Sequence, residues 1–148
     1  MHDDQLIQSF TRIIYIFGQL ERMPRDFGVG HLLYPSEVHV VDSIGKNPGI
    51  KLTDLAKTLG ITKGAVPKII RKLEAKGLVV RYQAEKNNKE VLFRLTDLGR
   101  KAGDGHTQFH KKFDRNIKQK LALLSTDQKA FLHVVFKELE AYGEELLR

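Results

Sequence analysis

The chain has 148 residues and a net charge of +7, with 41% hydrophobic and 29% charged residues, which is the composition of a folded globular chain of about one domain. Cysteine is absent, which excludes a disulfide scaffold, a thiolate nucleophile and a cysteine-based zinc finger. No apolar run is long enough to span a bilayer and the N-terminus lacks the features of a signal peptide, so no membrane association and a cytoplasmic location are expected.

The first predicted elements are helices. Apolar residues recur at helical spacing from Leu6 to Leu20, which predicts a long helix with one apolar face. Residues 23–30 (MPRDFGVG) end it with a proline and two glycines. A second helix is predicted from Pro35 to Gly45, with proline in its first turn, and residues 47–49 (NPG) form a turn.

Residues 51–77 have the pattern of a helix-turn-helix. Thr53 to Leu59 is predicted as a short helix closed by Gly60, and Thr62 is the expected N-cap of a second helix that runs to about Lys76. Pro67 lies slightly too deep in that helix to be free of cost. Small and apolar residues stand where two helices cross around a tight turn, namely Leu55, Ala56, Gly60, Ile61, Val66, Ile69 and Ile70.

The next segment predicts a β-wing followed by two helices. Leu78–Tyr82 and Val91–Leu95 are short β-prone runs around the polar loop 83–90 (QAEKNNKE). Thr96 begins another helix, and residues 125–128 (STDQ) form a capping box that opens the last one. The first and last helices are too apolar for a small monomer with one core, which favours a subunit interface.

Basic charge is concentrated in one segment. Residues 51–89 hold ten basic and three acidic residues, which equals the whole net charge of +7. A basic centre between neutral flanks indicates a module that binds a polyanion such as DNA. The N-terminal half of the second helix is expected in the major groove, and the wing at the minor groove or at phosphates. The candidate DNA-binding residues are Thr62, Lys63, Gly64, Ala65, Lys68 and Arg71 in the helix region, with Arg81, Lys86, Asn87, Asn88 and Lys89 in the wing.

The sequence resembles the MarR family of bacterial and archaeal transcription regulators. The resemblance is carried by residues 52–56 (LTDLA), 59–66 (LGITKGAV), 73–79 (LEAKGLV) and 95–99 (LTDLG), with Arg81, and it extends over essentially the whole chain. It implies a mainly α fold with a small β-wing. A winged helix-turn-helix DNA-binding domain is expected in residues 33–98, and a helical dimerisation region in residues 1–32 and 99–148.

The resemblance also implies a function and one departure. Members bind a pseudo-palindromic operator as homodimers, with one winged module per half-site, so we expect a transcriptional repressor without enzymatic activity. The wing of the family usually carries Asp-x-Arg. Asn87 and Lys89 stand at those positions here, so the Asp–Arg brace of the wing is missing.

Histidines suggest what the regulator senses. His106 and His110 are four residues apart on a predicted helix, a spacing that suits two imidazoles on one metal or simply two packed rings. Within the MarR family the chain looks most like the zinc-uptake repressors (AdcR/ZitR type). That resemblance places one four-coordinate Zn²⁺ per subunit on Glu21, His39, His106 and His110. It also indicates that a second metal site is not retained, because its positions hold Phe27, Val38 and Gly105.

The expected mechanism is allosteric, and three alternatives stay open. Metal would tie the first two helices to the long dimer helix and so set the distance between the two winged modules. The first alternative is a MarR-type regulator that responds to a small aromatic or phenolic ligand in a crevice lined by His39 and His106. The second is an enzyme with a metal centre, which lacks a nucleophile or second carboxylate. The third is a winged helix that binds only proteins.

Overall fold

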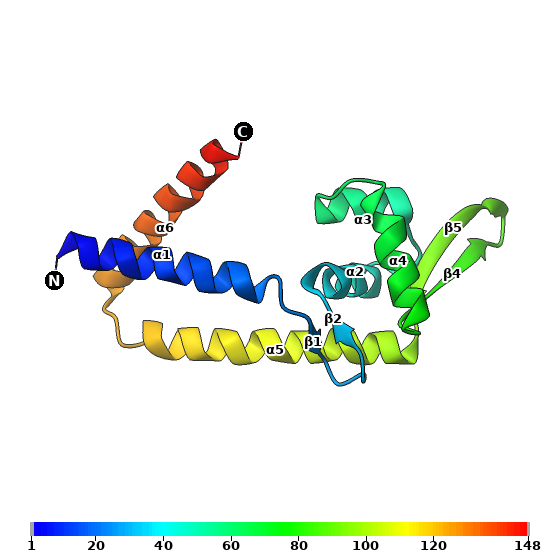
Figure 1. The fold of residues 1–148 in the computed structure, drawn as a ribbon, viewed down its shortest axis with the longest axis horizontal. Helices are drawn as coiled ribbons and strands as arrows, with labels where there is room; N and C mark the ends of the chain where they lie inside the picture. The colour runs from blue at the N-terminus through cyan, green and yellow to red at the C-terminus, as the bar shows by residue number, and fades with distance from the viewer. Residues whose placement is uncertain (1, 148) are drawn as a thin grey trace. The chain divides into compact units, whose positions relative to one another are not determined.

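The computed structural model describes residues 2–147, without the side chain of Asn88, and shows a mainly helical fold with a small β-wing (Figure 1). This confirms the fold class expected from the sequence. The chain divides into two compact units, one ending at Thr107 and the other beginning at Gln108. The elements are α1 (Asp3–Leu20), β1 (Arg25–Asp26), β2 (Leu32–Leu33), α2 (Pro35–Lys46), β3 (Ile50–Lys51), α3 (Leu52–Leu59), α4 (Ala65–Ala75), β4 (Val79–Ala84), β5 (Asn87–Leu95), α5 (Asp97–Leu121) and α6 (Thr126–Leu146).

The core of the first unit lies between α2, α3, α4 and a three-stranded sheet. The strand order is β3-β5-β4 and both pairings are antiparallel. Each helix turns one apolar stripe inward: Val40, Val41 and Ile44 from α2, Leu55 and Ala56 from α3, and Val66, Ile70 and Leu73 from α4 are all buried. Phe93 of the sheet closes this core. Helices α3 and α4 are in contact and Ala56 is buried, so the predicted packing of these two helices is confirmed.

The turn between α3 and α4 is confirmed, but the start of α4 differs from the prediction. Gly60 has a φ of 64°, the left-handed conformation that glycine tolerates best. Thr62 is not the N-cap, because α4 begins at Ala65 and Gly64 occupies the cap position. Pro67 is thus the third helical residue, where the N–H has no partner within the helix. The cost expected for Pro67 was therefore wrong.

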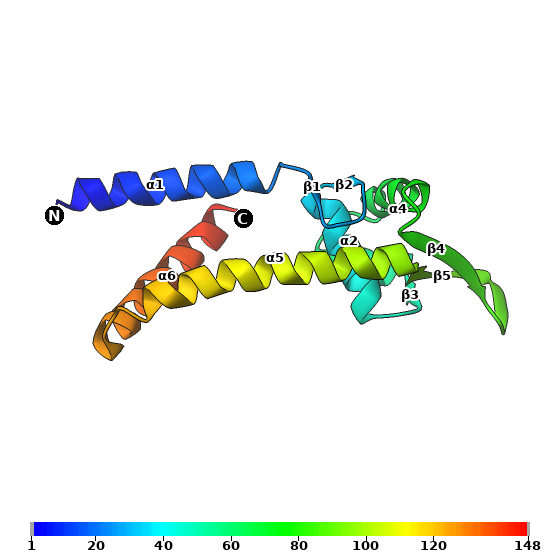
Figure 2. The same ribbon diagram turned by 90° about the horizontal axis from the view of Figure 1, so that it is seen from below.

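The two strands of the wing are longer, and the loop between them is shorter, than predicted. β4 and β5 pair from Val79 opposite Leu95 to Ala84 opposite Asn87, with an irregularity between Gln83 and Ala84. The prediction of an eight-residue loop over residues 83–90 was wrong, because most of this polar segment belongs to β4 and β5. A ribbon with solvent on both faces needs no apolar alternation, which is why composition concealed these strands. The two strands extend beyond α4 as a ribbon (Figures 1 and 2).

A small hairpin, β1–β2, occupies the segment that the sequence marked only as a break. The side chain of Asp26 accepts hydrogen bonds from the backbone N–H groups of Gly28 and Val29, both at 2.8 Å, and of Gly30 at 3.2 Å. These backbone hydrogen bonds, first that from Val29, hold the pKa of Asp26 below its usual value. The hairpin buries Leu33 in the core.

Two glycines let α5 approach the rest of the first unit. A Cβ on Gly99 would lie 2.0 Å from the backbone oxygen of Leu78, and one on Gly105 would lie 2.3 Å from that of Phe27. The sequence interpretation gave no such reason for a glycine at either position. Thr96 caps the helix as predicted, since its Oγ1 accepts a hydrogen bond from the Gly99 N–H at 3.0 Å.

The terminal helices expose their apolar residues. The predicted capping box opens α6, where the Gln128 N–H donates to Ser125 Oγ at 3.2 Å and the Ser125 N–H donates to Gln128 Oε1 at 2.8 Å. None of the described residues of α1 or α6 is buried. The large exposed apolar residues include Leu6, Ile7, Ile13 and Ile14 of α1, and Phe131, Val134, Phe136 and Tyr142 of α6. Within residues 2–147, no helix has the length and apolarity needed to cross a membrane.

Candidate nucleic-acid interface and metal site

Helix α4 presents a cationic surface opposite its buried stripe. Val66, Ile70 and Leu73 face the core, whereas Lys68, Arg71 and Lys72 are exposed. Thr62, Lys63 and Gly64 are exposed in the turn before the helix, and Ala65 is half-buried. The predicted contact residues of the helix region are therefore accessible to solvent, Ala65 only in part.

Several cations of the basic segment form ion pairs with carboxylates of the described residues. Lys51 pairs with Glu90, Lys76 with Glu37, and Arg81 with Glu74. Arg81 is one of the DNA contacts predicted in the wing. The structure shows Nε and Nη2 of Arg81 each donating a hydrogen bond of 2.6 Å to a different carboxylate oxygen of Glu74.

The Arg81–Glu74 pair joins strand β4 to helix α4. The hydrogen bond from Arg81 holds the pKa of Glu74 below its usual value, and the same bond raises the pKa of Arg81. A two-pronged contact of this kind restrains direction as well as distance. It therefore adds a directional contact between the wing and the helix.

At the tip of the wing, Lys86, Asn87 and Lys89 are exposed. The side chain of Asn87 accepts a hydrogen bond from the backbone N–H of Lys89 at 3.1 Å. Asn87 thereby stabilises the tight connection between β4 and β5. The predicted contact of Asn88 falls on a side chain outside those that the structure describes.

A buried carboxylate that the sequence analysis missed connects α2 to α4. Glu37 is 2% exposed and accepts hydrogen bonds from Lys76 Nζ at 2.8 and 2.9 Å. Lys76 also donates to the backbone oxygen of Leu32, and Glu37 accepts from the N–H of Tyr34, both at 2.8 Å. The sequence does carry a signal for Glu37, which lies three residues after the N-cap residue Tyr34, the spacing of a capping box.

The candidate metal ligands are partly assembled in the first unit. His106 of α5 is 6% exposed, and its ring centroid lies 5.6 Å from that of His39 in α2. Nδ1 of His106 lies 2.5 Å from Oδ2 of Asp42, another residue that the sequence analysis did not single out. The ring of Phe27 meets His106 edge-on, with centroids 5.3 Å apart.

The other two candidate ligands are placed separately. Glu21 is exposed and caps the C-terminus of α1. His110 is exposed, belongs to the second unit and contacts the ring of Phe109, with centroids 5.8 Å apart. Among the described residues, no three His, Asp or Glu side chains are grouped as ligands for one ion. The structure thus brings His39 and His106 together but does not assemble the predicted set of four.

Comparison with known proteins decides the family. Residues 33–91, which contain the helix-turn-helix and most of the wing, match the sequence model of the MarR family. The chain is 36% identical over 110 residues to the HTH-type transcriptional regulator PchR of Bacillus subtilis, a match that covers 72% of this chain and 65% of that protein. It is 29% identical over 125 residues to the uncharacterized regulator YhjH of the same bacterium, covering 84% and 71%.

This chain belongs to the MarR family. It is a helix-turn-helix transcriptional regulator and not an enzyme.

Two solved structures share the fold of this chain. FabT of Streptococcus pneumoniae, crystallised in complex with DNA, aligns with a TM-score of 0.67 and 26% identity over 97% of this chain and 96% of its own. ZitR of Lactococcus lactis, a zinc-responsive MarR-family member, aligns with a TM-score of 0.74 and 19% identity over 97% and 98%. At 19% identity the likeness to ZitR establishes the fold alone.

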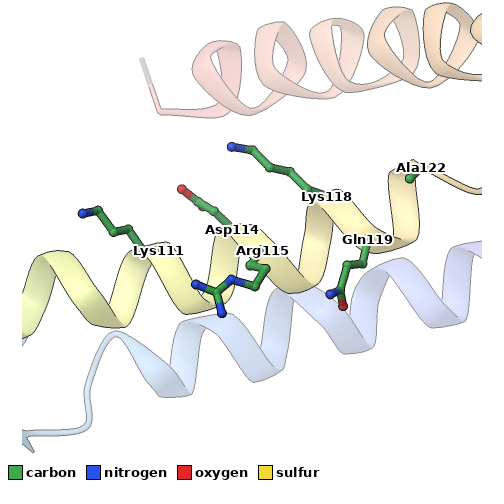
Figure 3. A pocket seen from close by; sticks show the side chains of 6 residues that line it. All are labelled: Lys111, Asp114, Arg115, Lys118, Gln119 and Ala122. Atoms are coloured by element: carbon green, nitrogen blue, oxygen red, sulfur yellow. The ribbon is translucent and has the colours of Figure 1, made fainter.

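A second basic surface of this MarR-family chain lies on α5 in the second unit. Lys111, Arg115 and Lys118 line a shallow pocket together with Asp114, Gln119 and Ala122 (Figure 3). The lining residues recur at intervals of three and four, so they belong to neighbouring turns of the helix. Three cations and one carboxylate leave this surface positive, outside the segment that carries the net charge of the chain.

Proposed function

We propose that the chain is a transcriptional repressor that acts in the cytoplasm and binds a pseudo-palindromic DNA operator as a homodimer. The observation that carries this proposal is that Lys68 and Arg71 of α4, and Lys63 in the turn before it, are exposed while Val66, Ile70 and Leu73 of the same helix are buried. An amphipathic helix at the surface of a winged module, with cations on its outer side, suits the major groove of DNA. FabT, a structural relative with 26% identity, was solved bound to DNA.

In the proposed complex, the segment Thr62–Arg71 reads the major groove. Gly64 and Ala65 permit close approach, while Thr62, Lys63, Lys68 and Arg71 contact base edges and phosphates. Lys86, Asn87, Asn88 and Lys89 contact the minor groove or flanking phosphates from the wing. Arg81 has two roles in this proposal. It pairs with Glu74, which helps to orient the wing, and it contacts DNA as one of the residues of the wing.

The dimer is proposed to form through residues 1–32 and 99–148, with residues 33–98 as the DNA-binding domain. The exposed apolar residues of α1 and α6 support this assignment, since large apolar side chains such as Ile7 at 61%, Ile14 at 55% and Phe131 at 72% exposed are unfavourable in water. Two copies give a two-fold axis that matches a pseudo-palindrome.

DNA binding is tested by fluorescence anisotropy with a duplex selected from a random library, at several salt concentrations. We expect binding that weakens linearly in the logarithm of salt concentration, because phosphate contacts release counterions. The double variant K68A/R71A should bind on the order of 100-fold more weakly, given about 1–3 kcal/mol per good base contact. The matched variant K129A/K137A removes two exposed cations of α6 and should bind like the parent chain. Equal loss in both variants would overturn the proposed interface.

We further propose a zinc response through Glu21, His39, His106 and His110. The donor set fits zinc in chemistry, since three imidazoles and one carboxylate are ligands that this ion takes in tetrahedral sites. The approach of the His39 and His106 rings supports the α2–α5 half of the set. When bound, zinc would link α2 and α5 through coordination bonds to their side chains. The residues themselves position the winged module on α5, through Asp42 and the Phe27 contact.

Zinc binding is tested first by elemental analysis of the purified chain, then by operator affinity with and without added Zn²⁺. We expect tighter DNA binding with zinc. The variant H106A/H110A should lose that dependence and keep the helical circular-dichroism spectrum. Equal operator affinities in both conditions would defeat the zinc response. Release from DNA by a small aromatic acid in a metal-free chain would support an organic ligand instead.

A further inference from the structure

The C-terminal half of α5 carries three cations that the function proposed above does not use. Lys111, Arg115 and Lys118 follow one another at intervals of four and three residues, so they form a cationic stripe on one face of the helix. All three are exposed, and Figure 3 shows them around the shallow pocket, which has a volume of about 540 Å³. Among the described residues, none of the three forms an ion pair with a carboxylate.

The cationic stripe is also left uncovered by its own unit. The pocket is lined by residues of α5 and by Ala122, which follows the helix. No described residue of α6 lines it, although the second unit contains α6 as well as α5 from Gln108 onward. The stripe is therefore accessible to another molecule.

Charge of the opposite sign gathers at the end of α6. Residues 108–122 hold five basic residues and one acidic residue, which gives +4, whereas the acidic segment, residues 138–147, holds four acidic and no basic residues, which gives −4. The four acidic residues are exposed, namely Glu138, Glu140, Glu144 and Glu145. Glu140 pairs with Lys137, whereas Glu138 and Glu145 form no ion pair with other described residues.

The two surfaces match in spacing as well as in sign. Lys111 and Lys118 are seven residues apart, and so are Glu138 and Glu145. Seven residues of α-helix rise about 10.5 Å, so two helices lying side by side can bring both lysines to a glutamate at once. This holds whether the two helices run parallel or antiparallel.

The centres of the two surfaces match too. Arg115 lies four residues after Lys111, and Tyr142 lies four residues after Glu138. Tyr142 is 60% exposed, which leaves its ring open to contact. A guanidinium over an aromatic ring is attractive, so Arg115 gains a partner in the same alignment that pairs the lysines.

We propose that the cationic stripe of α5 binds the acidic segment of α6 from a second copy of the chain. The inference rests on the proposed homodimer and deepens it by naming two surfaces that meet. Two-fold symmetry makes the contact occur twice in the dimer. The exposed apolar residues supply most of the binding energy, and the charged contact selects the alignment of the helices, because complementary charge gives specificity more than affinity.

Charge reversal tests the contact, with dimer dissociation measured by sedimentation equilibrium. K111E/K118E sets carboxylates against carboxylates at both copies of the contact and should weaken dimerisation on the order of 100-fold. E138K/E145K sets cations against cations and should weaken it by a similar factor. The matched control K112E/K129E reverses two exposed cations of the same unit that do not line the pocket, and should dimerise like the parent chain.

Mixing the two variants separates a contact between copies from other uses of the cationic stripe. An equimolar mixture of K111E/K118E and E138K/E145K should form a heterodimer with about the affinity of the parent dimer, because every contact again joins opposite charges. If the cationic stripe met α6 of its own chain, the mixture would not recover. If it bound DNA, K111E/K118E would stay dimeric and lose operator affinity. Either result overturns the inference.

A second measurement does not depend on reversed charge. The chain contains no cysteine, so an introduced thiol is the only one present. R115C mixed with Y142C should be joined by a short thiol-specific crosslinker, since both helix directions place these residues opposite each other. K112C mixed with Y142C is the control and should give little product, because Lys112 does not line the pocket. Equal yields would overturn the inference even if the charge-reversed variants did not fold.

The outcomes distinguish the inference from the function on which it rests. A parent chain that sediments as a monomer defeats the proposed homodimer and this contact together. A dimeric parent chain whose dissociation constant changes less than twofold in K111E/K118E overturns the charged contact alone.

Discussion

Lys76 at the C-terminal end of α4 donates hydrogen bonds to both carboxylate oxygens of Glu37 near the start of α2, at 2.8 and 2.9 Å. Glu37 is almost fully buried, whereas the Lys76 side chain is 23% exposed. The pair joins the end of α4 to α2, the helix that carries His39 and Asp42. Because a buried charge is unfavourable without its partner, the stability of this junction depends on both residues.

The first prediction concerns this pair. K76M leaves the Glu37 carboxylate buried without its cation, and should lower the free energy of unfolding by about 3 kcal/mol. Urea denaturation followed by circular dichroism measures the change. K72M, which removes an exposed cation one turn earlier in α4, is the control and should cost less than about 0.5 kcal/mol. Similar losses in both variants would show that the pair contributes little.

The second prediction concerns pH and the wing. The pKa of Glu74 is lowered by the hydrogen bond from Arg81, so the pair stabilises the folded chain above the unfolded-state pKa, near the model-compound value of 4.5. That stability is lost as pH falls through the lower folded-state pKa. E74Q should therefore be less stable than the parent chain at pH 7, by less than about 1 kcal/mol because Arg81 is exposed.

Unfolding curves of E74Q and the parent chain between pH 7 and pH 2 measure this effect. The difference in stability should shrink below about pH 4 and vanish once Glu74 is protonated in both states. If the difference in stability between E74Q and the parent chain stays constant over this range, the charge of the Glu74 carboxylate is not its cause.

The third prediction uses two nearby glycines of α5. G105A brings a Cβ to 2.3 Å from the Phe27 oxygen and should destabilise the chain by about 1–3 kcal/mol, since the β1–β2 hairpin must move away. G103A makes only ordinary contacts, at 3.7 Å from Asp42 and 3.8 Å from Val41, and should be neutral or stabilising by up to about 1 kcal/mol. Thermal unfolding of the two variants compares them directly. Equal shifts would mean that the approach to Phe27 is not restrictive.

The fourth prediction tests the proposed dimer. Ile7 and Ile14 are seven residues apart on α1, on one face of the helix, and are 61% and 55% exposed. I7K/I14K should produce a monomer in sedimentation experiments, with operator affinity reduced on the order of 100-fold because two half-sites no longer bind together. Q8K/T11K adds the same charge to other exposed positions of α1 and should stay dimeric. A parent chain that sediments as a monomer would contradict the proposal at once.

Local patterns predicted the helix-turn-helix, the caps at Thr96 and Ser125 and the buried faces of the helices. These features depend on neighbours within a few residues, which periodicity and capping residues report well. The start of α4 was misplaced because Thr62 is an adequate cap by type, whereas Pro67 allows the first turn to begin only at Ala65. The polar strands of the wing carry no apolar alternation, so their pairing was invisible to composition.

Contacts between distant segments were the part that the sequence could not reveal. Asp42 and His106 are 64 residues apart, and Glu37 and Lys76 are 39 apart. Neither pair has a motif of its own, because the fold alone brings the partners together. The same holds for Gly105, where the requirement for glycine comes from the backbone of Phe27. His106 was singled out by its spacing from His110 and His39 by resemblance, and the structure adds the carboxylate of Asp42 beside His106.

The place of Pro67 has a consequence for altering operator choice. As the third residue of α4 it cannot donate to the carbonyl of Lys63, so the helix is barred from winding one residue further toward its N-terminus. Side chains exchanged at positions 62, 63, 65 or 68 would therefore emerge with the same rotational phase as the originals. The proposed DNA specificity of α4 can therefore be changed by substituting these side chains alone, provided that Pro67 is kept to fix the residue at which the helix begins.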